Sequence, residues 1–147
     1  MSHSKVKIWI HGILGVKNRE NLIGLEIENK IHNIIKKQII EADCFLEEIN
    51  GTENHIHILF LLNPQIPISD FFKQIKGSSS HDINYEDLTR IKFSWQVGFG
   101  AFSVSESHLE DVKLYIRNQK EYHKKMTFQE EYDKLIKLYK LEKFVNR

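Results

Sequence analysis

The sequence predicts an α+β domain whose strands and helices follow the order β-α-β-β-α-β, with two further helices at the end. Three observations support this prediction. Four segments are rich in β-branched and aromatic residues, and the other segments place apolar residues at helical spacing. Apolar residues make up 41% of the 147 residues, which is enough to bury one core. No internal linker or repeat interrupts the chain, so we expect one domain over residues 1–147, with a C-terminal helical part over residues 106–147.

The first half of the chain predicts a strand, a helix and a hairpin. Residues 5–14 are rich in β-branched and aromatic side chains, which is typical of a strand. Over residues 20–41, isoleucines recur at three- and four-residue steps and predict an amphipathic helix. Two strand-like segments, residues 44–49 and 54–62, flank Asn50-Gly51, a pair that favours tight reverse turns. We therefore expect a β-hairpin here.

The second half opens with a short helix and a bent strand. Ser69 stands where a helix N-cap is expected, and Gly77 is expected to end that helix. Residues 91–104 predict a strand that is bent or bulged at Gly98 and Gly100.

Two pairs with capping-box spacing predict the last two helices. Ser107 and Glu110 predict a helix that runs to about residue 125, and Thr127 and Glu130 predict the helix that follows. The complete order is that of a ferredoxin-like βαββαβ domain, an antiparallel sheet with helices on one face, extended by two C-terminal helices.

Composition and charge narrow the possible classes. The single cysteine, Cys44, excludes a disulfide framework and favours a reducing, cytosolic setting. No apolar segment is long enough to span a bilayer, so we expect no membrane partner. The formal charge of +1 argues against a nucleic-acid partner, but this value is a sum over the whole chain and hides a local excess. Residues 113–147 hold ten basic and five acidic residues, and this local excess would suit a phosphate backbone.

Two short motifs bear candidate chemistry. His55-Ile56-His57 lies on a predicted strand, so both imidazoles emerge on one face about 7 Å apart, a geometry that suits two ligands of one ion. A chance pair of polar residues on an exposed sheet face has the same pattern. Tyr115 and Gln119 are four residues apart and share one face of a predicted helix, where a surface tyrosine is also ordinary.

Taken together, the two motifs resemble the HUH (His-hydrophobic-His) nucleases, and in particular the single-tyrosine transposases of the insertion-sequence 200/605 family. The resemblance covers nearly the whole chain. Its other landmarks are Ile10-His11, Lys17-Asn18-Arg19, residues 76–80, Trp95-Gln96, residues 98–105, His123 and residues 127–132. Asn54 stands where relatives often carry Asp, which keeps a hydrogen-bond acceptor beside the first histidine and removes a charge.

The resemblance implies an activity and a set of site residues. The family cleaves and rejoins single-stranded DNA at the ends of a mobile element, and His55, His57 and Gln119 would ligate a divalent metal, Mg²⁺ or Mn²⁺. Tyr115 would be the nucleophile and would leave a 5′-phosphotyrosine on the enzyme. The base that deprotonates Tyr115 is not identified by the sequence. His11 would approach the site if its strand neighbours the hairpin, whereas His123 has no spacing partner that marks it as a ligand.

The resemblance also implies partners and a location. The substrate would be hairpin-forming single-stranded DNA, the chain would form a homodimer with active sites shared between subunits, and it would act in the cytoplasm, at the nucleoid when bound to DNA. Candidates for DNA contact are basic and hydroxyl side chains in matching segments: Lys17, Arg19, Lys76, Ser78, Ser79, Arg117 and Lys120. A solvated charged face is the ordinary alternative for these residues.

Two other functions stay open at this point. A host-adapted relative would bind hairpin DNA, or act as a nuclease, without transposition. A structural βαββαβ module would carry the His-x-His pair by chance.

Overall fold

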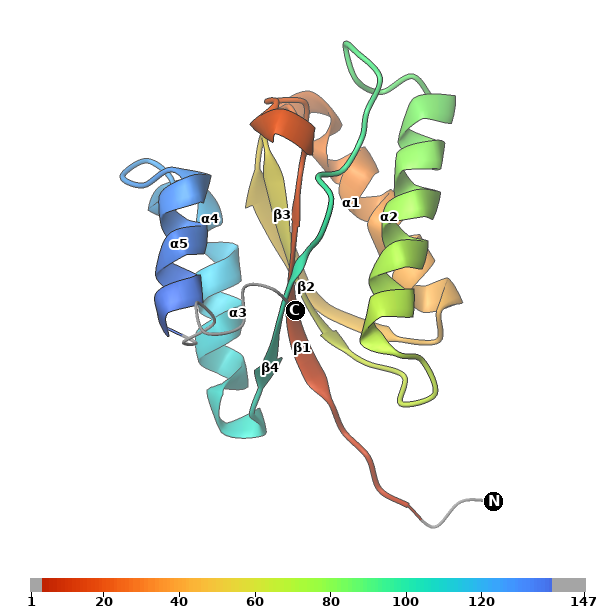
Figure 1. The fold of residues 1–147 in the computed structure, drawn as a ribbon, viewed down its shortest axis with the longest axis vertical. Helices are drawn as coiled ribbons and strands as arrows, with labels where there is room; N and C mark the ends of the chain where they lie inside the picture. The colour runs from red at the N-terminus through yellow and green to blue at the C-terminus, as the bar shows by residue number, and fades with distance from the viewer. Residues whose placement is uncertain (1–3, 139–147) are drawn as a thin grey trace.

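The computed structural model describes residues 4–138 and confirms the predicted α+β fold with one antiparallel sheet (Figure 1). The strands are β1 (Trp9–Gly15), β2 (Phe45–Thr52), β3 (His55–Leu61) and β4 (Gly100–Val104). The helices are α1 (Leu25–Glu41), α2 (Ile68–Tyr85), α3 (Leu109–Arg117), α4 (Gln119–Tyr122) and α5 (Phe128–Leu138), with 3₁₀ turns η1 (Lys17–Arg19) and η2 (Glu106–His108). The strand order is β2-β3-β1-β4, as a ferredoxin-like domain requires. Residues 139–147 of the predicted C-terminal helical part lie outside the described residues.

Helices cover both faces of the sheet (Figure 1). Strand β3 decides which side chains meet which helices, because successive residues point to opposite faces. Ile56, Ile58 and Phe60 are fully buried in the main core with the apolar side chains of α1 and α2. Leu59 points the other way and packs with residues of α3 such as Leu109 and Ile116. The predicted alternation in this strand is confirmed, and the two layers of helices have separate cores.

The hairpin is confirmed, but its predicted turn at Asn50-Gly51 is wrong. Thr52 pairs with His55, so the two-residue loop is formed by Glu53 and Asn54. Gly51 lies inside β2 and not in a reverse turn, and the backbone of β3 approaches it closely. A Cβ atom at this position would lie 2.1 Å from the carbonyl oxygen of His55. Glycine is therefore needed here for space, not for its freedom at positive φ.

Helix α2 does not end at Gly77, as the sequence suggested, but continues to Tyr85. Buried positions recur at helical spacing through the glycine, with Ile75 before it and Ser79 and Ile83 after it. Packing of this continuous stripe outweighs the weak stop signal of one glycine. The helix also begins earlier than expected, because its N-cap residue is Pro67 and not Ser69.

The predicted strand over residues 91–104 is regular only in β4. Before β4, the chain makes one isolated bridge between Trp95 and Val16 and then forms an exposed loop. Gly98 has φ of 89°, so the expected bend is real and needs glycine. Lys76 of α2 holds this loop, since its ammonium donates to the carbonyl oxygens of Gln96 and Gly98, each at 2.7 Å.

The helix predicted to run to about residue 125 is broken at Asn118 into α3 and α4. The amide of Asn50 donates to the carbonyl oxygen of Arg117 at 2.9 Å and satisfies a backbone group at the break. Ser107 does not cap α3, which begins only after the turn η2. The second capping box is confirmed, because the Thr127 hydroxyl accepts from the backbone N–H of Glu130 at 3.1 Å.

Candidate active site

The two histidines of β3 lie under the C-terminal helices, on the face of the sheet opposite α1 and α2. His55, His57 and Gln119 are fully buried, and Glu131 is 1% exposed. A polar cluster with so little exposure requires internal partners for every donor and acceptor. The structure brings together His55, His57, Tyr115 and Gln119, four residues that the sequence singled out.

His55 is held by its hydrogen bonds within the hairpin. Its Nδ1 lies 2.8 Å from Oδ1 of Asn54 and 3.0 Å from the hydroxyl of Thr52. Because Oδ1 only accepts, the tautomer of a neutral ring that satisfies Asn54 carries its hydrogen on Nδ1 and offers the lone pair of Nε2 to the site. Nε2 then lies 3.0 Å from Oε1 of Gln119. Asn54, which replaces the expected Asp, still orients the imidazole.

His57 is oriented by His11 of the neighbouring strand β1. Strand β1 pairs with β3, which meets the condition set for an approach of His11, and Nε2 of His11 lies 2.8 Å from Nδ1 of His57. Burial, together with the charge of His57, lowers the pKa of His11 to about 3, and burial also lowers the pKa of His57. This contact with His11 fixes the orientation of the His57 ring, whose Nε2 faces Glu131 at 3.2 Å.

Glu131 of α5 lies at the centre of the cluster, although the sequence did not single it out as a site residue. Its Oε1 lies 3.2 Å from Nε2 of His57 and 2.9 Å from Nε2 of His123. Its Oε2 accepts hydrogen bonds from the Tyr115 hydroxyl and from the Gln119 amide. Burial works against ionisation, but the contacts with His55 and His57 outweigh it and lower the pKa of Glu131 to about 2. The carboxylate is therefore charged at neutral pH.

His123 was not expected as a ligand, but it belongs to the same cluster. The ligand atoms of His55, His57, His123 and Glu131 lie within 4.8 Å of one another, so this group could bind a metal ion. A signal was present in the sequence, since residues 115, 119 and 123 follow at four-residue steps. No such spacing links them to Glu131, which lies on a different helix.

Tyr115 completes the cluster from α3. It is half-buried, and its ring packs edge-on against His57, with 5.7 Å between ring centroids, and against His11 at 6.0 Å. Its hydroxyl is directed to Glu131. The phenol oxygen and the candidate metal ligands therefore converge on one point.

The predicted DNA contacts have varied surroundings. Lys17 is exposed and Ser78 is half-buried, whereas Ser79 is buried and accepts from the Trp95 indole at 2.9 Å. Arg19 lies over the Phe128 ring at 5.6 Å from its centroid, next to the site. The other three candidates are engaged within the chain: Lys76 by the loop at 96–98, Arg117 by Glu48 at 2.8 Å and Lys120 by Glu28 at 2.8 Å.

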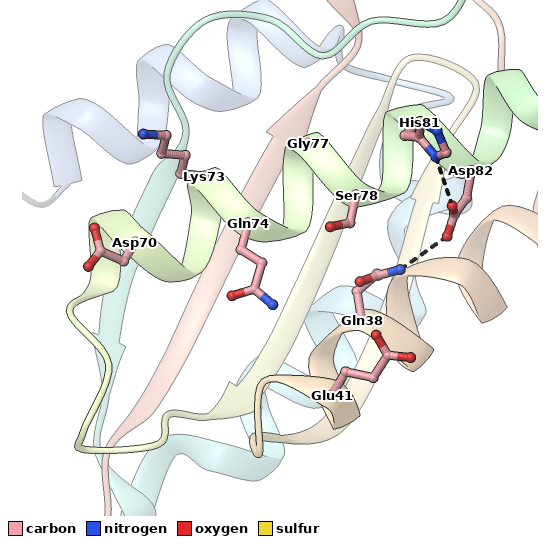
Figure 2. A pocket seen from close by; sticks show the side chains of 9 residues that line it. All are labelled: Gln38, Glu41, Asp70, Lys73, Gln74, Gly77, Ser78, His81 and Asp82. Atoms are coloured by element: carbon pink, nitrogen blue, oxygen red, sulfur yellow. Dashed lines mark hydrogen bonds and ion pairs between the residues drawn. The ribbon is translucent and has the colours of Figure 1, made fainter.

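A separate hollow of about 760 Å³ lies between α1 and α2 (Figure 2). Figure 2 shows Gln38 and Glu41 of α1 facing Gln74 and Ser78 of α2 across it. Gln38 donates to Asp82 at 3.1 Å. The hollow lies on the face of the sheet opposite to the two histidines of β3. Neither His55 nor Tyr115 lines it, so the hollow is not part of the candidate active site.

The low pKa values of the buried histidines predict a loss of stability in mild acid. The unfolded chain takes up protons below about pH 6.5, whereas His11 stays neutral in the folded protein until about pH 3 and His123 until about pH 4. Between pH 6.5 and 4.5 the free energy of unfolding should therefore fall, by up to about 1.4 kcal/mol per pH unit for His11. Urea unfolding with a chelator present measures it. His11→Asn should flatten the profile, whereas the exposed control His81→Asn should not; equal profiles for both would contradict the assignment.

The family of this chain follows from comparison with known proteins. Residues 4–119 match the family model described as "Transposase IS200 like". The chain belongs to the IS200-like transposase family. This IS200-like transposase is 25% identical over 114 residues to ISDra2 transposase TnpA of Deinococcus radiodurans. The alignment covers 74% of this chain and 81% of the relative. It is also 25% identical over 134 residues to the transposase for insertion sequence element IS200 of Salmonella typhimurium, which covers 82% of each chain.

Solved structures show the same fold as this IS200-like transposase. A crystal structure described as a transposase from D. radiodurans R1 superposes with a TM-score of 0.63 at 21% identity, over 81% of this chain and 95% of that one. A REP-associated tyrosine transposase bound to a REP hairpin also gives 0.63, at 16% identity, over 84% of this chain and 74% of that one. Within residues 4–138, no helix has the length and apolar character needed to cross a membrane.

Proposed function

We propose that this transposase cleaves and rejoins single-stranded DNA at the ends of a mobile element, with Tyr115 as its nucleophile. The observation that carries the proposal is the convergence of the Tyr115 hydroxyl with His57 and Gln119 around Glu131. Family membership supports DNA cleavage and transfer as the reaction class. A tyrosine beside a cluster of potential metal ligands supplies both the attacking oxygen and a means of stabilising charge on phosphate.

The proposed step exchanges one phosphate ester for another. Oη of Tyr115 attacks the scissile phosphorus, and the new O–P bond forms as the bond from phosphorus to the 3′ oxygen breaks. The products are a 5′-phosphotyrosine and a free 3′-hydroxyl, which takes up a proton. Oε2 of Glu131 accepts the hydrogen bond of the Tyr115 hydroxyl, so this carboxylate is placed to receive the phenol proton. Attack by another 3′-hydroxyl on the phosphotyrosine reverses the step without an energy source.

The donor set fits a divalent cofactor. We propose that His55, His57 and Gln119 hold Mg²⁺ or Mn²⁺, since the contacts at both Nδ1 atoms orient the rings with their Nε2 atoms directed into the site. When bound, the ion would withdraw charge from the scissile phosphate. The hydrogen bond from the Tyr115 hydroxyl to Glu131 orients the attacking phenol oxygen.

The remaining partners follow from the same proposal. We propose that the chain acts in the cytoplasm, as one domain over residues 1–147 and as a homodimer, on hairpin-forming DNA. Among the basic candidate contacts, Lys17 and Arg19 are those whose side chains are engaged by neither an ion pair nor a backbone carbonyl in the described part of the chain. Support for a hairpin comes from the fold neighbour that is bound to a REP hairpin. The alternative, a host-adapted hairpin-DNA binding protein or nuclease, keeps the binding and lacks strand transfer.

A covalent adduct tests the nucleophile. The protein is incubated with Mn²⁺ and a single-stranded oligonucleotide carrying an element end, labelled at its 3′ end, because that fragment stays on the tyrosine. Wild type should give a labelled protein band on a denaturing gel, and Tyr115→Phe should give none. Tyr122→Phe is the matched control, since its ring packs against Tyr115 with centroids 5.4 Å apart. An adduct on Tyr115→Phe would refute the assignment, and hairpin binding without any adduct would favour the alternative.

A further inference from the structure

We propose that His123 and Glu131 are metal ligands that complete one site with His55 and His57, and that this site prefers a first-row transition ion such as Mn²⁺ to Mg²⁺. The inference rests on the proposed function, because it concerns the same ion. It adds two ligands that lie beyond residue 119, where the family match ends.

The geometry of the four groups is that of ligands around a common centre. Oε1 of Glu131 lies 2.9 Å from Nε2 of His123, 3.2 Å from Nε2 of His57 and 3.4 Å from Nε2 of His55. All four ligand atoms lie within 4.8 Å of one another. They come from β3, the loop after α4, and α5, so the tertiary fold and no single local motif brings them together.

The outer hydrogen bonds of His123 and His55 favour the tautomer of each ring in which Nε2 is available as a ligand atom. Nδ1 of His123 lies 2.7 Å from the carbonyl oxygen of Met126, which only accepts, so the hydrogen of a neutral ring is on Nδ1. Nδ1 of His55 is bound in the same way to Oδ1 of Asn54. The Nε2 lone pairs of both rings therefore face oxygen lone pairs of Glu131 and Gln119.

Such an arrangement is unfavourable unless a cation lies between the atoms. A bound divalent ion would satisfy all of these lone pairs at once. The single negative charge of Glu131 would offset half of the charge of the ion inside the protein.

The local structure of α5 supports a fixed role for Glu131. The capping box between Thr127 and Glu130 sets the first turn of α5, and the backbone N–H of Glu131 donates to the carbonyl oxygen of Thr127 at 3.0 Å. The amide of Gln119 donates to Oε2 of Glu131 at 2.9 Å, which orients the carboxylate. The side chain is therefore positioned before any ion binds, which reduces the entropic cost of binding.

The donor set decides the preferred ion. Mg²⁺ favours six oxygen ligands and releases its water reluctantly, whereas imidazole nitrogens suit first-row transition ions. Three imidazoles and one carboxylate should bind Mn²⁺ more tightly than Mg²⁺, and Co²⁺ and Zn²⁺ more tightly still. A site made only of His55, His57 and Gln119 would have two imidazoles and no negative charge.

Calorimetric titration of the metal-free full chain with Mn²⁺ tests the added ligands. Glu131→Gln and His123→Asn should each weaken Mn²⁺ binding by about tenfold or more. The matched controls Glu110→Gln and His81→Asn change the same residue types at exposed positions and should bind as wild type does. Wild-type affinity in both Glu131→Gln and His123→Asn would overturn the inference. Equal affinity of the wild-type site for Mg²⁺ and Mn²⁺ would overturn the stated preference.

A second measurement needs no variant. Pulsed electron paramagnetic resonance of Mn²⁺ bound to the wild-type chain counts coordinated imidazole nitrogens, and we expect three; two would exclude His123. The adduct assay keeps this result apart from the proposed function. If an adduct forms on Tyr115 while only two imidazoles bind, the added ligands are wrong and the nucleophile stands. If three imidazoles bind and no adduct forms, the ligands stand and the proposed reaction fails.

Discussion

A mixture of His57→Ala protein with Tyr115→Phe protein should not recover DNA strand cleavage. In the structure, Tyr115 and the two histidines of β3 belong to one chain and meet through Glu131 of that chain. Each variant would then lack one essential group in every site that it forms. The measurement is the labelled adduct from each variant alone, from the mixture, and from wild type diluted to the same concentration.

Two ion pairs keep α3 on the sheet of its own chain. Lys113 binds Glu47 at 3.0 Å and Arg117 binds Glu48 at 2.8 Å, so α3 is tied to β2. The chain enters this block through a short connection after β4, near Ser105. If two subunits exchanged the block there, every contact would be kept between chains, and the mixture would recover cleavage. Recovery, with a dimer by light scattering, would support the shared sites that the family resemblance predicts.

Gly51→Ala should destabilise the protein by about 3 kcal/mol or more. The added Cβ would lie 2.1 Å from the carbonyl oxygen of His55 and 2.9 Å from Cα of Ile56, both backbone atoms of the paired strand. Relief requires the hairpin to open at the residue that bears the first histidine. Urea unfolding measures the loss, and we expect weaker Mn²⁺ binding in the fraction that still folds.

Gly77→Ala provides the matched control. Gly77 lies within α2, and a Cβ there would meet nothing within 4 Å. Alanine restricts the unfolded chain more than glycine does, so this variant should gain about 0.5–1 kcal/mol. Equal stability of the two alanine variants would mean that space at Gly51 is not limiting.

The sequence predicts the sheet well because its strongest signals are periodic. The alternation over residues 55–61 placed the histidines on one face and the isoleucines on the other, and both are found there. Local stop signals were less reliable. Gly77 was expected to end a helix, but the buried stripe of α2 continues past it. Asn50-Gly51 was expected to turn the hairpin, but pairing of Thr52 with His55 moved the loop to the next two residues.

The candidate site was predicted only as far as short-range spacing reaches. His55 with His57 and Tyr115 with Gln119 are pairs within one element, so their shared faces follow from the period of a strand or a helix. Glu131 is reached through a break at Asn118 and a loop before α5, and neither fixes a direction from sequence alone. His123 had the right spacing from Gln119, but without Glu131 opposite it the spacing marked no site.

Substitutions on the two faces of β3 should have different effects, although they alternate along seven consecutive residues. Substitutions at positions 56, 58 and 60 should lower the abundance of folded protein in a cell, since these side chains fill the main core. Substitutions at positions 55 and 57 should leave more folded protein but reduce turnover per molecule. Selection for folded abundance and selection for catalytic activity therefore act on alternate residues of this strand. An insertion of one residue would move each set of side chains to the opposite face of the sheet.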